Sequence, residues 1–331
     1  MSQSNDVQVS VLMICYNHER YLSQAIESVL SQQTSFPFEV LIYDDKSTDA
    51  SRDLISRYQE QHPDIIKCIF PGENQFSKGK SPLCDFLVPA ATGKYIAELE
   101  CDDAWIGTDK LQTQFDYMES HAGVALCAHS AELYNDTAGK IDGIASDCAE
   151  AMTFSTQDLI MRGGAALPTC SYFSRTSDMK NYLQWRPSNC PVGDWPMMLY
   201  LSTCGSVVCL PEVLGLYRVA VASSWTGRRS ANADATAKFD KRMLGMIDEL
   251  ISKMPSEFYA SLRVKQAEYF FDLAFRADVS AKKLEEELDY RLEVSSAQLL
   301  NLRIKLVIKR IVNALGLMPL VERMMILRAS K

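Results

Sequence analysis

Residues 93–103 read Gly-Lys-Tyr-Ile-Ala-Glu-Leu-Glu-Cys-Asp-Asp, and this stretch decides the fold more than any other. A short apolar run follows the turn at Thr92-Gly93 and ends in carboxylates, which is typical of a buried strand. Ligands of open α/β sheets bind at the carboxyl ends of the strands. The stretch therefore predicts a strand that delivers Glu100, Asp102 and Asp103 to the ligand-binding edge of a parallel sheet.

Carboxylates packed this closely repel one another unless a cation or ribose hydroxyls compensate them. A hard divalent ion that also grips a diphosphate would do so. In the alternative interpretation, Asp102 and Asp103 form a polar turn that caps the helix expected from about Asp109. The local sequence leaves both interpretations open.

Composition sets the class of protein. The 331 residues are 47% hydrophobic and 23% charged, which is typical of a soluble globular protein. No run of about 18 apolar residues predicts a membrane span, and the polar N-terminus lacks a signal pattern. Ten cysteines without a C-x-x-C pair indicate reduced thiols in a cytoplasmic protein, and four histidines without H-E-x-x-H spacing argue against a zinc hydrolase.

Charge is unevenly distributed along the chain. The net charge is −8, yet residues 301–331 carry seven basic side chains and one acid, a net of +6. The rest of the chain is therefore near −14. An acidic body argues against nucleic acid as a partner, and the basic tail indicates a separate role.

Strand-like and helix-like segments alternate over residues 7–130. Alternation of this kind predicts βαβ units and a mostly parallel sheet covered on both faces by helices. The expected strands are 7–15, 38–43, 65–70 and 94–99, and the expected helices are 19–32, 47–61 and 109–120. Residues 123–225 are a mixed continuation with strand-like segments at 124–128, 170–173 and 207–210. Helical periodicity dominates 236–331, so we predict a catalytic domain over 1–235 and a helical extension over 236–331.

Two strand ends near the N-terminus offer contacts for a nucleotide base. Tyr16, beside Asn17, presents an aromatic face, and Asp45 is an acceptor for an imide N–H such as that of uracil. Each has a structural alternative, because Tyr16 can pack in the core and Asp45 can form a turn with Ser47-Thr48.

Three segments in order carry a resemblance to a known family. They are Val-Ser-Val-Leu-Met-Ile-Cys-Tyr-Asn at 9–17, Ile-Glu-Ser-Val-Leu-Ser-Gln at 26–32 and Phe-Glu-Val-Leu-Ile-Tyr-Asp-Asp-Lys-Ser-Thr-Asp at 38–49. Together with the acidic stretch and Asp109-Lys110-Leu111, they closely resemble family 2 glycosyltransferases of the GT-A fold. The resemblance covers about residues 7–225. It implies a Rossmann-like α/β fold, with a mixed, mostly parallel sheet flanked by helices.

The resemblance also implies site residues on the donor side. Tyr16, Asn17 and Asp45 would bind the base, Asp102 would contact the ribose and the metal, and Asp103 would ligate Mg²⁺ or Mn²⁺ under the diphosphate.

Three further residues complete the implied donor side. Glu100 stands where many members of the family have Asp. The change keeps the charge and makes the side chain longer by one methylene group. In the loop 71–81, Lys78 and Lys80 would neutralise the diphosphate, with solvated loop charges as the alternative.

The implied acceptor side centres on Asp194, in Cys-Pro-Val-Gly-Asp-Trp at 190–195. In the family an acid at the start of a late helix takes the proton of the acceptor hydroxyl, which requires a carboxylate within hydrogen-bond reach. The alternative is a plain helix cap, with Pro196 in the first turn. Trp195 would stack on a sugar ring or lie in the core.

One segment departs from the family pattern. Tyr217-Arg218-Val219-Ala220 resembles a segment that often ends in His, and Ala220 occupies that place. A metal or diphosphate contact is therefore missing there, which puts the strength of metal dependence in doubt. The candidate substitutes are Ser223, Ser224, Arg228 and Arg229.

The basic tail contains an amphipathic pattern. Apolar residues fall on one helical face, with basic residues outside it (Ile304, Val307, Ile308, Ile311 and Leu315 against Lys305, Lys309 and Arg310). This pattern favours contact with a membrane surface, and the alternative is packing on the catalytic domain or on a second subunit in a homo-oligomer.

These observations favour an inverting glycosyltransferase that moves a sugar from a UDP- or dTDP-linked donor to a hydroxyl of a glycan or lipid-linked acceptor. The expected setting is bacterial surface polysaccharide synthesis, in the cytoplasm or at the inner face of the membrane. A sugar-1-phosphate nucleotidyltransferase would need a Gly-rich basic loop after the first strand, where Tyr16-Asn17-His18 stands instead. A non-catalytic partner protein is the third interpretation, although Asp103 and Asp194 are both present. The sequence does not specify the sugar, the acceptor or the linkage.

Overall fold

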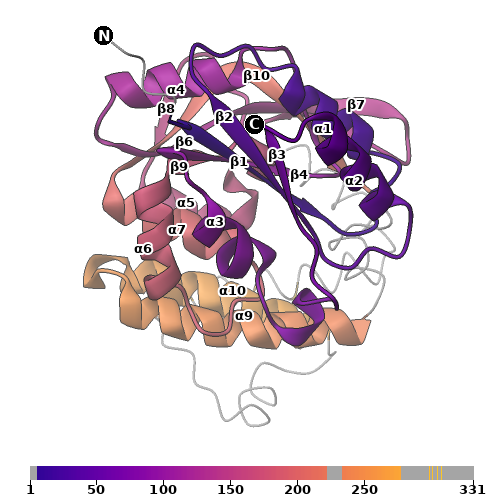
Figure 1. The fold of residues 1–331 in the computed structure, drawn as a ribbon. Helices are drawn as coiled ribbons and strands as arrows, with labels where there is room; N and C mark the ends of the chain where they lie inside the picture. Colours follow the sequence, from indigo (N-terminus) through magenta and orange to yellow (C-terminus); the bar gives the residue numbers. More distant parts are fainter. Residues whose placement is uncertain are drawn as a thin grey trace.

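The computed structural model describes residues 6–221 and 233–276, together with residues 298, 300, 304 and 307. Within these ranges one sheet of ten strands runs in the order β3-β2-β1-β4-β9-β6-β10-β5, with β7 beside β6 and β8 beside β10 (Figure 1). The strands are β1 (Val9–Cys15), β2 (Phe38–Asp44), β3 (Ile66–Ile69), β4 (Tyr95–Glu100), β5 (Ala104–Trp105), β6 (Val124–Asn135), β7 (Lys140–Ala145), β8 (Met152–Phe154), β9 (Phe173–Arg175) and β10 (Ser206–Val219).

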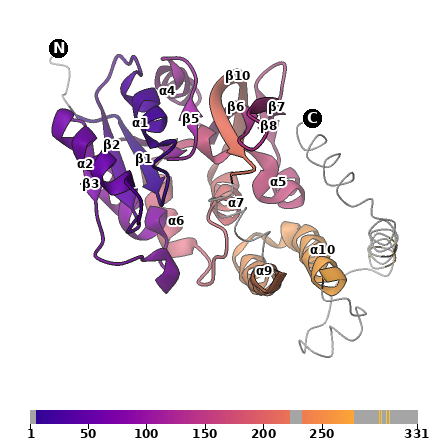
Figure 2. The ribbon, with the colours of Figure 1, turned by 90° about the vertical axis from the view of Figure 1, so that its right-hand side faces the viewer.

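Helices cover both faces of this sheet, as Figure 1 and Figure 2 show from two sides. One apolar core joins the sheet to α1 (Leu22–Leu30), α2 (Ser51–Gln61) and α4 (Lys110–Ser120). The opposite core joins it to α3 (Val88–Ala90), α5 (Thr156–Arg162), α6 (Thr176–Trp185), α7 (Asp194–Cys204), α9 (Ala233–Lys253) and α10 (Tyr259–Arg276). The predicted α/β class is confirmed.

The centre of the sheet is parallel. β1 pairs in parallel with β2 on one side and β4 on the other, and β6 pairs in parallel with β10. β9 lies antiparallel between β4 and β6, which makes the sheet mixed. The turn before β4 requires glycine, since a Cβ on Gly93 would lie 2.6 Å from the backbone nitrogen of Ser10. The loop into β4 therefore packs directly on β1 and fixes where β4 begins.

The C-terminal half of the sheet differs from the expected boundaries. The strand expected at 170–173 begins only at Phe173, because Thr169–Ser171 form a 3-10 turn, η4. The strand expected at 207–210 extends to Val219 as β10, with register irregularities against β6 between Leu210 and Gly215. This extension carries Arg218 to the edge of the sheet where β1 and β4 end.

Residues 233–276 form two helices that lie beneath α7 in Figure 2. Apolar side chains of α9 and α10, including Met246 and Leu262, join the core that contains Met198 of α7. Glu249 of α9 accepts hydrogen bonds from the Ser188 backbone (2.7 Å) and hydroxyl (2.8 Å), in the loop that leads into α7. The division at residue 235 stays a prediction, and α9 and α10 pack closely on the catalytic half.

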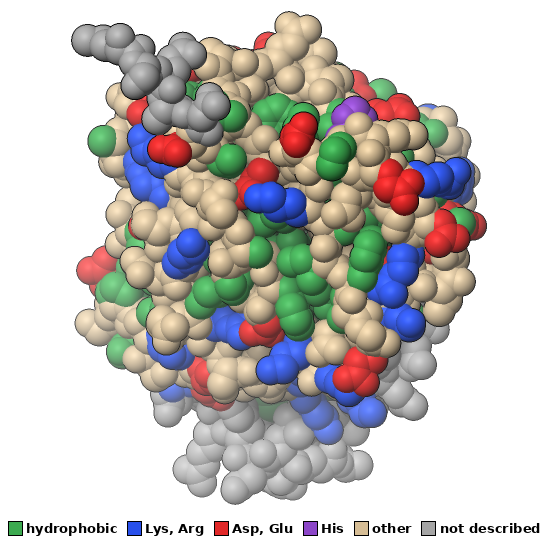
Figure 3. Space-filling model, in the orientation of Figure 1, with side chains coloured by type: hydrophobic (Ala, Val, Ile, Leu, Met, Phe, Trp, Pro, Cys, Tyr) green, Lys and Arg blue, Asp and Glu red, His purple; other side chains and the backbone are tan. Residues whose placement is uncertain are grey.

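The predicted basic helix of residues 301–331 lies outside the described residues, apart from isolated positions. In the part of the chain that the structure covers, no helix combines the length and apolarity that crossing a membrane requires. Figure 3 shows one face of the molecule, on which basic and acidic side chains are interspersed.

Candidate active site

The acidic stretch lies at the carboxyl edge of the parallel strands, as predicted. β4 ends at Glu100, opposite Ile14 of β1, and the Cys101 N–H donates to the Ile14 carbonyl (3.0 Å). Asp102 and Asp103 follow in a turn in which the Asp103 N–H donates to the Glu100 carbonyl (3.0 Å). Both aspartates are buried, at 8% and 1% exposure. We call these two residues the acidic turn.

Asp103 holds an unused acceptor. Its Oδ1 accepts the backbone N–H of Arg218 (2.7 Å), whereas its Oδ2 is buried and has no hydrogen-bond partner among the described residues. Burial, and then the charges of Asp102 and Glu100, raise the pKa of Asp103 well above its ordinary value. A buried carboxylate oxygen without a partner is costly, and a cation beside it would remove that cost.

Asp194 lies near the acids at the end of β4, on the sheet face that α7 covers. It is the first residue of α7, and its Oδ1 accepts the Trp195 N–H (2.8 Å). Burial raises the pKa of Glu98 to about 8, and the Asp194 charge adds to this shift. Alternation along β4 places Glu98 and Glu100 on one face, so the three carboxylates share one region. Burial also raises the pKa of Asp194 itself.

Glu100 is solvent-exposed, unlike its neighbours. Loss of surrounding water, and then the charges of Asp102, Asp194 and Glu98, raise its pKa to about 8. Glu100 therefore lies in the negative field between the acidic turn and Asp194.

The predicted base contacts follow β1 and β2 at this edge. These strands pair up to Cys15 and Asp44, and the Asp45 N–H donates to the Cys15 carbonyl (3.0 Å), which places Tyr16 and Asp45 on adjacent strand ends. Tyr16 is half-buried and Asp45 is 2% exposed.

The Asp45 carboxylate already accepts three hydrogen bonds. Its Oδ1 accepts the Tyr43 hydroxyl (3.1 Å) and the Gln75 N–H (2.8 Å), and its Oδ2 accepts the Phe76 N–H (3.1 Å). Asp45 thereby anchors the loop 71–81 beside the end of β2. A base N–H would have to share Oδ2 with this loop.

Asn17 has a structural role that the sequence did not reveal. Its φ of 59° lies in the left-handed region, which Asn tolerates well. Its N–H donates to the Ser47 hydroxyl (2.9 Å) and its side-chain oxygen accepts the Thr48 N–H (2.7 Å). Asn17 thus joins the loops after β1 and β2, and its contact with the donor stays a prediction.

Lys78 and Lys80 lie on the loop that Asp45 anchors. Lys78, in the 3-10 turn η1 (Phe76–Lys78), forms an ion pair with Glu73, and both side chains are more than half exposed. Lys80 is exposed and follows Gly79. The pairing of Lys78 agrees with the alternative of a solvated loop charge, and contact with a diphosphate stays a prediction for both lysines.

Trp195 corrects a prediction. Its side chain is fully buried in the core, and its indole N–H donates to the Leu159 carbonyl (3.0 Å). The ring therefore packs against α5 and is not presented to a sugar. Trp195 therefore lies in the core, which was the alternative interpretation. The reason is that α7 is apolar on nearly all sides, and Trp195 belongs to the same core as residues of α5, α9 and α10.

Three residues near the site were missed. Asp44 is fully buried, pairs with Arg52 (3.0 Å), and leaves its Oδ1 without a hydrogen-bond partner in the described ranges. His18 Nε2 lies 3.8 Å from Asp102 Oδ2. The Arg218 guanidinium donates to the Asp102 carbonyl. His18 and Asp44 were detectable as polar residues at strand ends, whereas the contact of Arg218 spans 116 positions and has no local signal.

Ala220 ends this segment with a φ of 59°, and its carbonyl accepts the Thr137 hydroxyl (3.0 Å). The candidate substitutes at 223, 224, 228 and 229 lie outside the described residues. In the described part of the chain, no three His, Cys, Asp or Glu side chains are grouped so that they alone could hold a metal ion. A metal at the acidic turn would therefore need oxygen ligands from the donor or water, which is how Mg²⁺ is commonly bound.

Comparison with known proteins settles the family. The model of glycosyl transferase family 2 matches residues 10–173. An uncharacterised glycosyltransferase of Nostoc sp. is 31% identical over 236 residues, which is 70% of this chain and 71% of the relative. The chain belongs to glycosyl transferase family 2. The family model spans β1 through the acidic turn to β9 and ends before Asp194.

Other relatives differ in coverage. An uncharacterised protein of Mycobacterium tuberculosis is 29% identical over 239 residues, and the chain spans only 65% of that relative's length. The Escherichia coli protein WfaP, named as a UDP-Glc:alpha-D-GlcNAc-diphosphoundecaprenol beta-1,3-glucosyltransferase, is 35% identical over 112 residues, which is 34% of this chain and 41% of WfaP.

Two solved structures share the fold of this family 2 member. Staphylococcus aureus TarS 1-349 with UDP-GlcNAc gives a TM-score of 0.56 at 16% identity, over 89% of this chain and 79% of that one. The mannosyltransferase PcManGT of Pyrobaculum calidifontis, with GDP-Man and Mn²⁺, gives a TM-score of 0.56 at 15% identity. The match covers 98% of this chain and 86% of PcManGT. The predicted GT-A architecture is confirmed.

Proposed function

We propose that this protein is an inverting glycosyltransferase that moves a sugar from a nucleotide diphosphate sugar to an acceptor hydroxyl. The observation that supports the proposal is the proximity of Asp194 to the end of β4, where loss of surrounding water and the Asp194 charge raise the pKa of both Glu98 and Glu100. An inverting reaction needs a base on the side opposite the leaving group, and we assign that role to Asp194.

In this proposal the chain's residues divide the work. Asp194, with a raised pKa, accepts the proton of the acceptor hydroxyl. Tyr16 and Asp45 hold the base of the donor, and Asp102 and Asp103 would hold Mg²⁺ or Mn²⁺ together with the diphosphate. The unpartnered Asp103 Oδ2 and the all-oxygen donor set fit such an ion. The ion, when bound, would screen the charge of the departing diphosphate.

The relatives support the class of substrate. WfaP is named for UDP-Glc and a diphosphoundecaprenol-linked acceptor, and PcManGT was determined with GDP-Man and Mn²⁺. We propose a UDP- or dTDP-linked donor here, because Asp45 suits an imide N–H that uracil and thymine share. We also propose a glycan or lipid-linked acceptor in bacterial surface polysaccharide synthesis, which the diphosphoundecaprenol-linked acceptor named for WfaP supports.

A donor screen tests the proposed function. Thermal unfolding would be followed with a panel of nucleotide sugars, each with Mn²⁺ and with EDTA. A true donor at about 100 to 1,000 times its Kd should stabilise the fold by about 2–4 kcal/mol. We expect the largest rise in Tm for a UDP- or dTDP-sugar with Mn²⁺. The same Tm with every nucleotide sugar, in Mn²⁺ and in EDTA alike, would contradict the proposal.

Asp45→Ala should weaken the binding of free UDP and of the UDP-sugar alike, because the lost contact is to the base that both ligands share. We expect each Kd to rise about 10-fold, because a hydrogen bond to a charged group usually contributes about that much to affinity. Isothermal titration with both ligands measures this. A loss of affinity confined to the sugar nucleotide would place Asp45 elsewhere in the site. The control is Asp53→Ala, at an exposed position of α2.

Metal-dependent binding should strengthen as the pH rises. Loss of surrounding water and the neighbouring acids raise the pKa of Glu100 to about 8 and also raise the pKa of Asp103, so binding of a cation should compete with protons there. We expect the Mn²⁺-dependent part of UDP affinity to increase from about pH 6 and to level off above about pH 8. UDP titrations at several pH values with Mn²⁺, and again with EDTA, separate this part. A flat Mn²⁺-dependent profile would contradict the assignment.

A further inference from the structure

Arg218 connects three parts of the molecule near the end of β10. Its backbone N–H donates to Asp103 Oδ1 (2.7 Å), and its guanidinium donates through Nη1 to the Asp102 carbonyl. Through Nη2 the same guanidinium donates to Gln24 Oε1 on α1 (2.5 Å). One residue thus ties the acidic turn to β10 and to α1.

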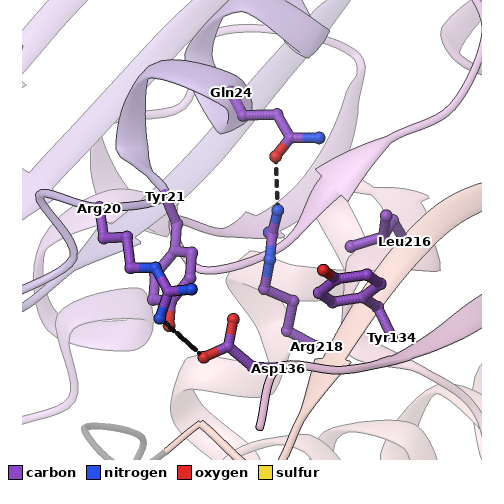
Figure 4. A pocket seen from close by; sticks show the side chains of 7 residues that line it. All are labelled: Arg20, Tyr21, Gln24, Tyr134, Asp136, Leu216 and Arg218. Atoms are coloured by element: carbon purple, nitrogen blue, oxygen red, sulfur yellow. Dashed lines mark hydrogen bonds and ion pairs between the residues drawn. The ribbon is translucent and has the colours of Figure 1, made fainter. Parts of the chain in front are cut away.

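The guanidinium is also held by aromatic side chains. It lies 4.9 Å from the centre of the Tyr21 ring and 5.9 Å from that of Tyr134. The Tyr21 hydroxyl donates to Asp136 (2.8 Å), so this ring is itself fixed. Figure 4 shows Arg218 between Gln24 and Tyr134, facing a pocket of about 310 Å³ that Arg20 also lines. Cation–π contacts and a forked donor restrict the guanidinium to one position.

This position opposes the repulsion within the acidic turn. Asp102 and Asp103 are buried next to one another at the end of β4, so their negative charges repel. The Arg218 guanidinium brings a positive charge to this turn through its bond to the Asp102 carbonyl, and the Arg218 backbone N–H donates to Asp103 Oδ1. Replacing the Arg218 side chain would remove its charge and its bond to the Asp102 carbonyl, whereas the backbone N–H at this position would still donate to Asp103.

We propose that Arg218 is a positioning residue, which holds the acidic turn in the conformation that binds the metal and the donor diphosphate. It acts through Asp102 and Asp103 and through α1. The inference rests on the proposed function, because it takes the acidic turn as the metal site. Its effect should therefore appear in metal-dependent binding, although no metal ligand is removed.

The test compares two arginines of one pocket. Arg20 lies on the same pocket, 5.2 Å from the Tyr21 ring centre, and pairs with Asp136 (3.0 Å), but its described contacts do not reach the acidic turn. Arg218→Met and Arg218→Lys would be compared with Arg20→Met. Titrations with UDP are run in Mn²⁺ and in EDTA, and the EPR spectrum of bound Mn²⁺ reports directly on its ligands.

We expect Arg218→Met to weaken Mn²⁺-dependent UDP binding about 10-fold to 100-fold, the worth of one or two charged hydrogen bonds. Arg218→Lys should recover part of this loss, because it keeps the charge without the fork. In EDTA, the UDP affinity of both Arg218 variants should stay within about twofold of wild type. Arg20→Met should bind UDP as wild type does in Mn²⁺ and in EDTA. Equal Mn²⁺-dependent binding and an unchanged EPR spectrum in Arg218→Met would overturn the inference.

Two further variants keep the outcomes distinct. If Arg218→Met does not fold, Gln24→Ala removes only the α1 end of the link, and we expect a loss of about threefold to tenfold. No loss in Gln24→Ala and in Arg218→Lys would also overturn the inference. If Asp103→Ala keeps Mn²⁺-dependent binding, the metal assignment itself fails. If Asp103→Ala loses this binding and the Arg218 variants keep it, only the inference fails.

Discussion

In the Asp194→Asn enzyme we expect sugar transfer to fall about 100-fold to 10,000-fold, the usual worth of a positioned general base. The substitution keeps the size and shape of the side chain and removes its basicity. Donor and metal affinity should change little, because Asp194 lies on α7 and is not part of the acidic turn. Single-turnover transfer rates, with donor titrations on the same preparation, measure both quantities.

A neighbouring glycine provides an independent check on Asp194. A Cβ added at Gly164 would lie 2.7 Å from Asp194 Oδ2, so the carboxylate must shift. Gly164→Ala should therefore lower the transfer rate while the base keeps its chemistry. Full activity in Asp194→Asn would show that another group takes the proton, and Asp194 would then be a plain helix-terminal residue.

Asp103→Ala should abolish metal-dependent donor binding. The substitution removes the one carboxylate of the acidic turn that combines a buried, unpartnered oxygen with a raised pKa. We expect the Kd for UDP in Mn²⁺ to rise to the value measured in EDTA, while circular dichroism and thermal unfolding in EDTA report an intact fold. Asp53→Ala, on exposed α2, is the matched control.

The fold should tolerate the loss of Asp103 for an electrostatic reason. A carboxyl with a raised pKa in the folded state destabilises that state once the pH exceeds its unfolded value, near 4. Removing it relieves repulsion from Asp102 and Glu100, at the cost of the bond from the Arg218 N–H. Equal Mn²⁺-dependent UDP affinity in wild type and Asp103→Ala would overturn the metal assignment.

The parallel half of the fold was predictable because its signals are local. The apolar runs that became β1, β2 and β4 each end in polar residues, and parallel pairing then brings those ends to one edge. The acids of the site therefore followed from sequence alone. The helical period of 19–32 gave α1 in the same way, with boundaries shifted by a few residues.

The features of the site that could not be predicted depend on contacts between segments far apart in the sequence. Arg218 meets Asp102 across 116 positions, and Asp45 is occupied by backbone N–H groups of Gln75 and Phe76, 30 and 31 positions away. No periodicity encodes such contacts. Trp195 was ambiguous for a related reason, since its burial depends on α5 and on helices that follow it in the chain.

The hydrogen bonds from Ser188 to Glu249 affect how the enzyme is made. The acidic turn can assemble once β10 has left the ribosome, because its partners all precede residue 220. Ser188, in the loop that leads to Asp194, is bonded to Glu249 of α9, which is synthesised later. During translation the partners of the acidic turn are therefore complete before the bond between Ser188 and α9 can form. A nascent chain released between these stages would hold the acids of the donor side before its base has a fixed place.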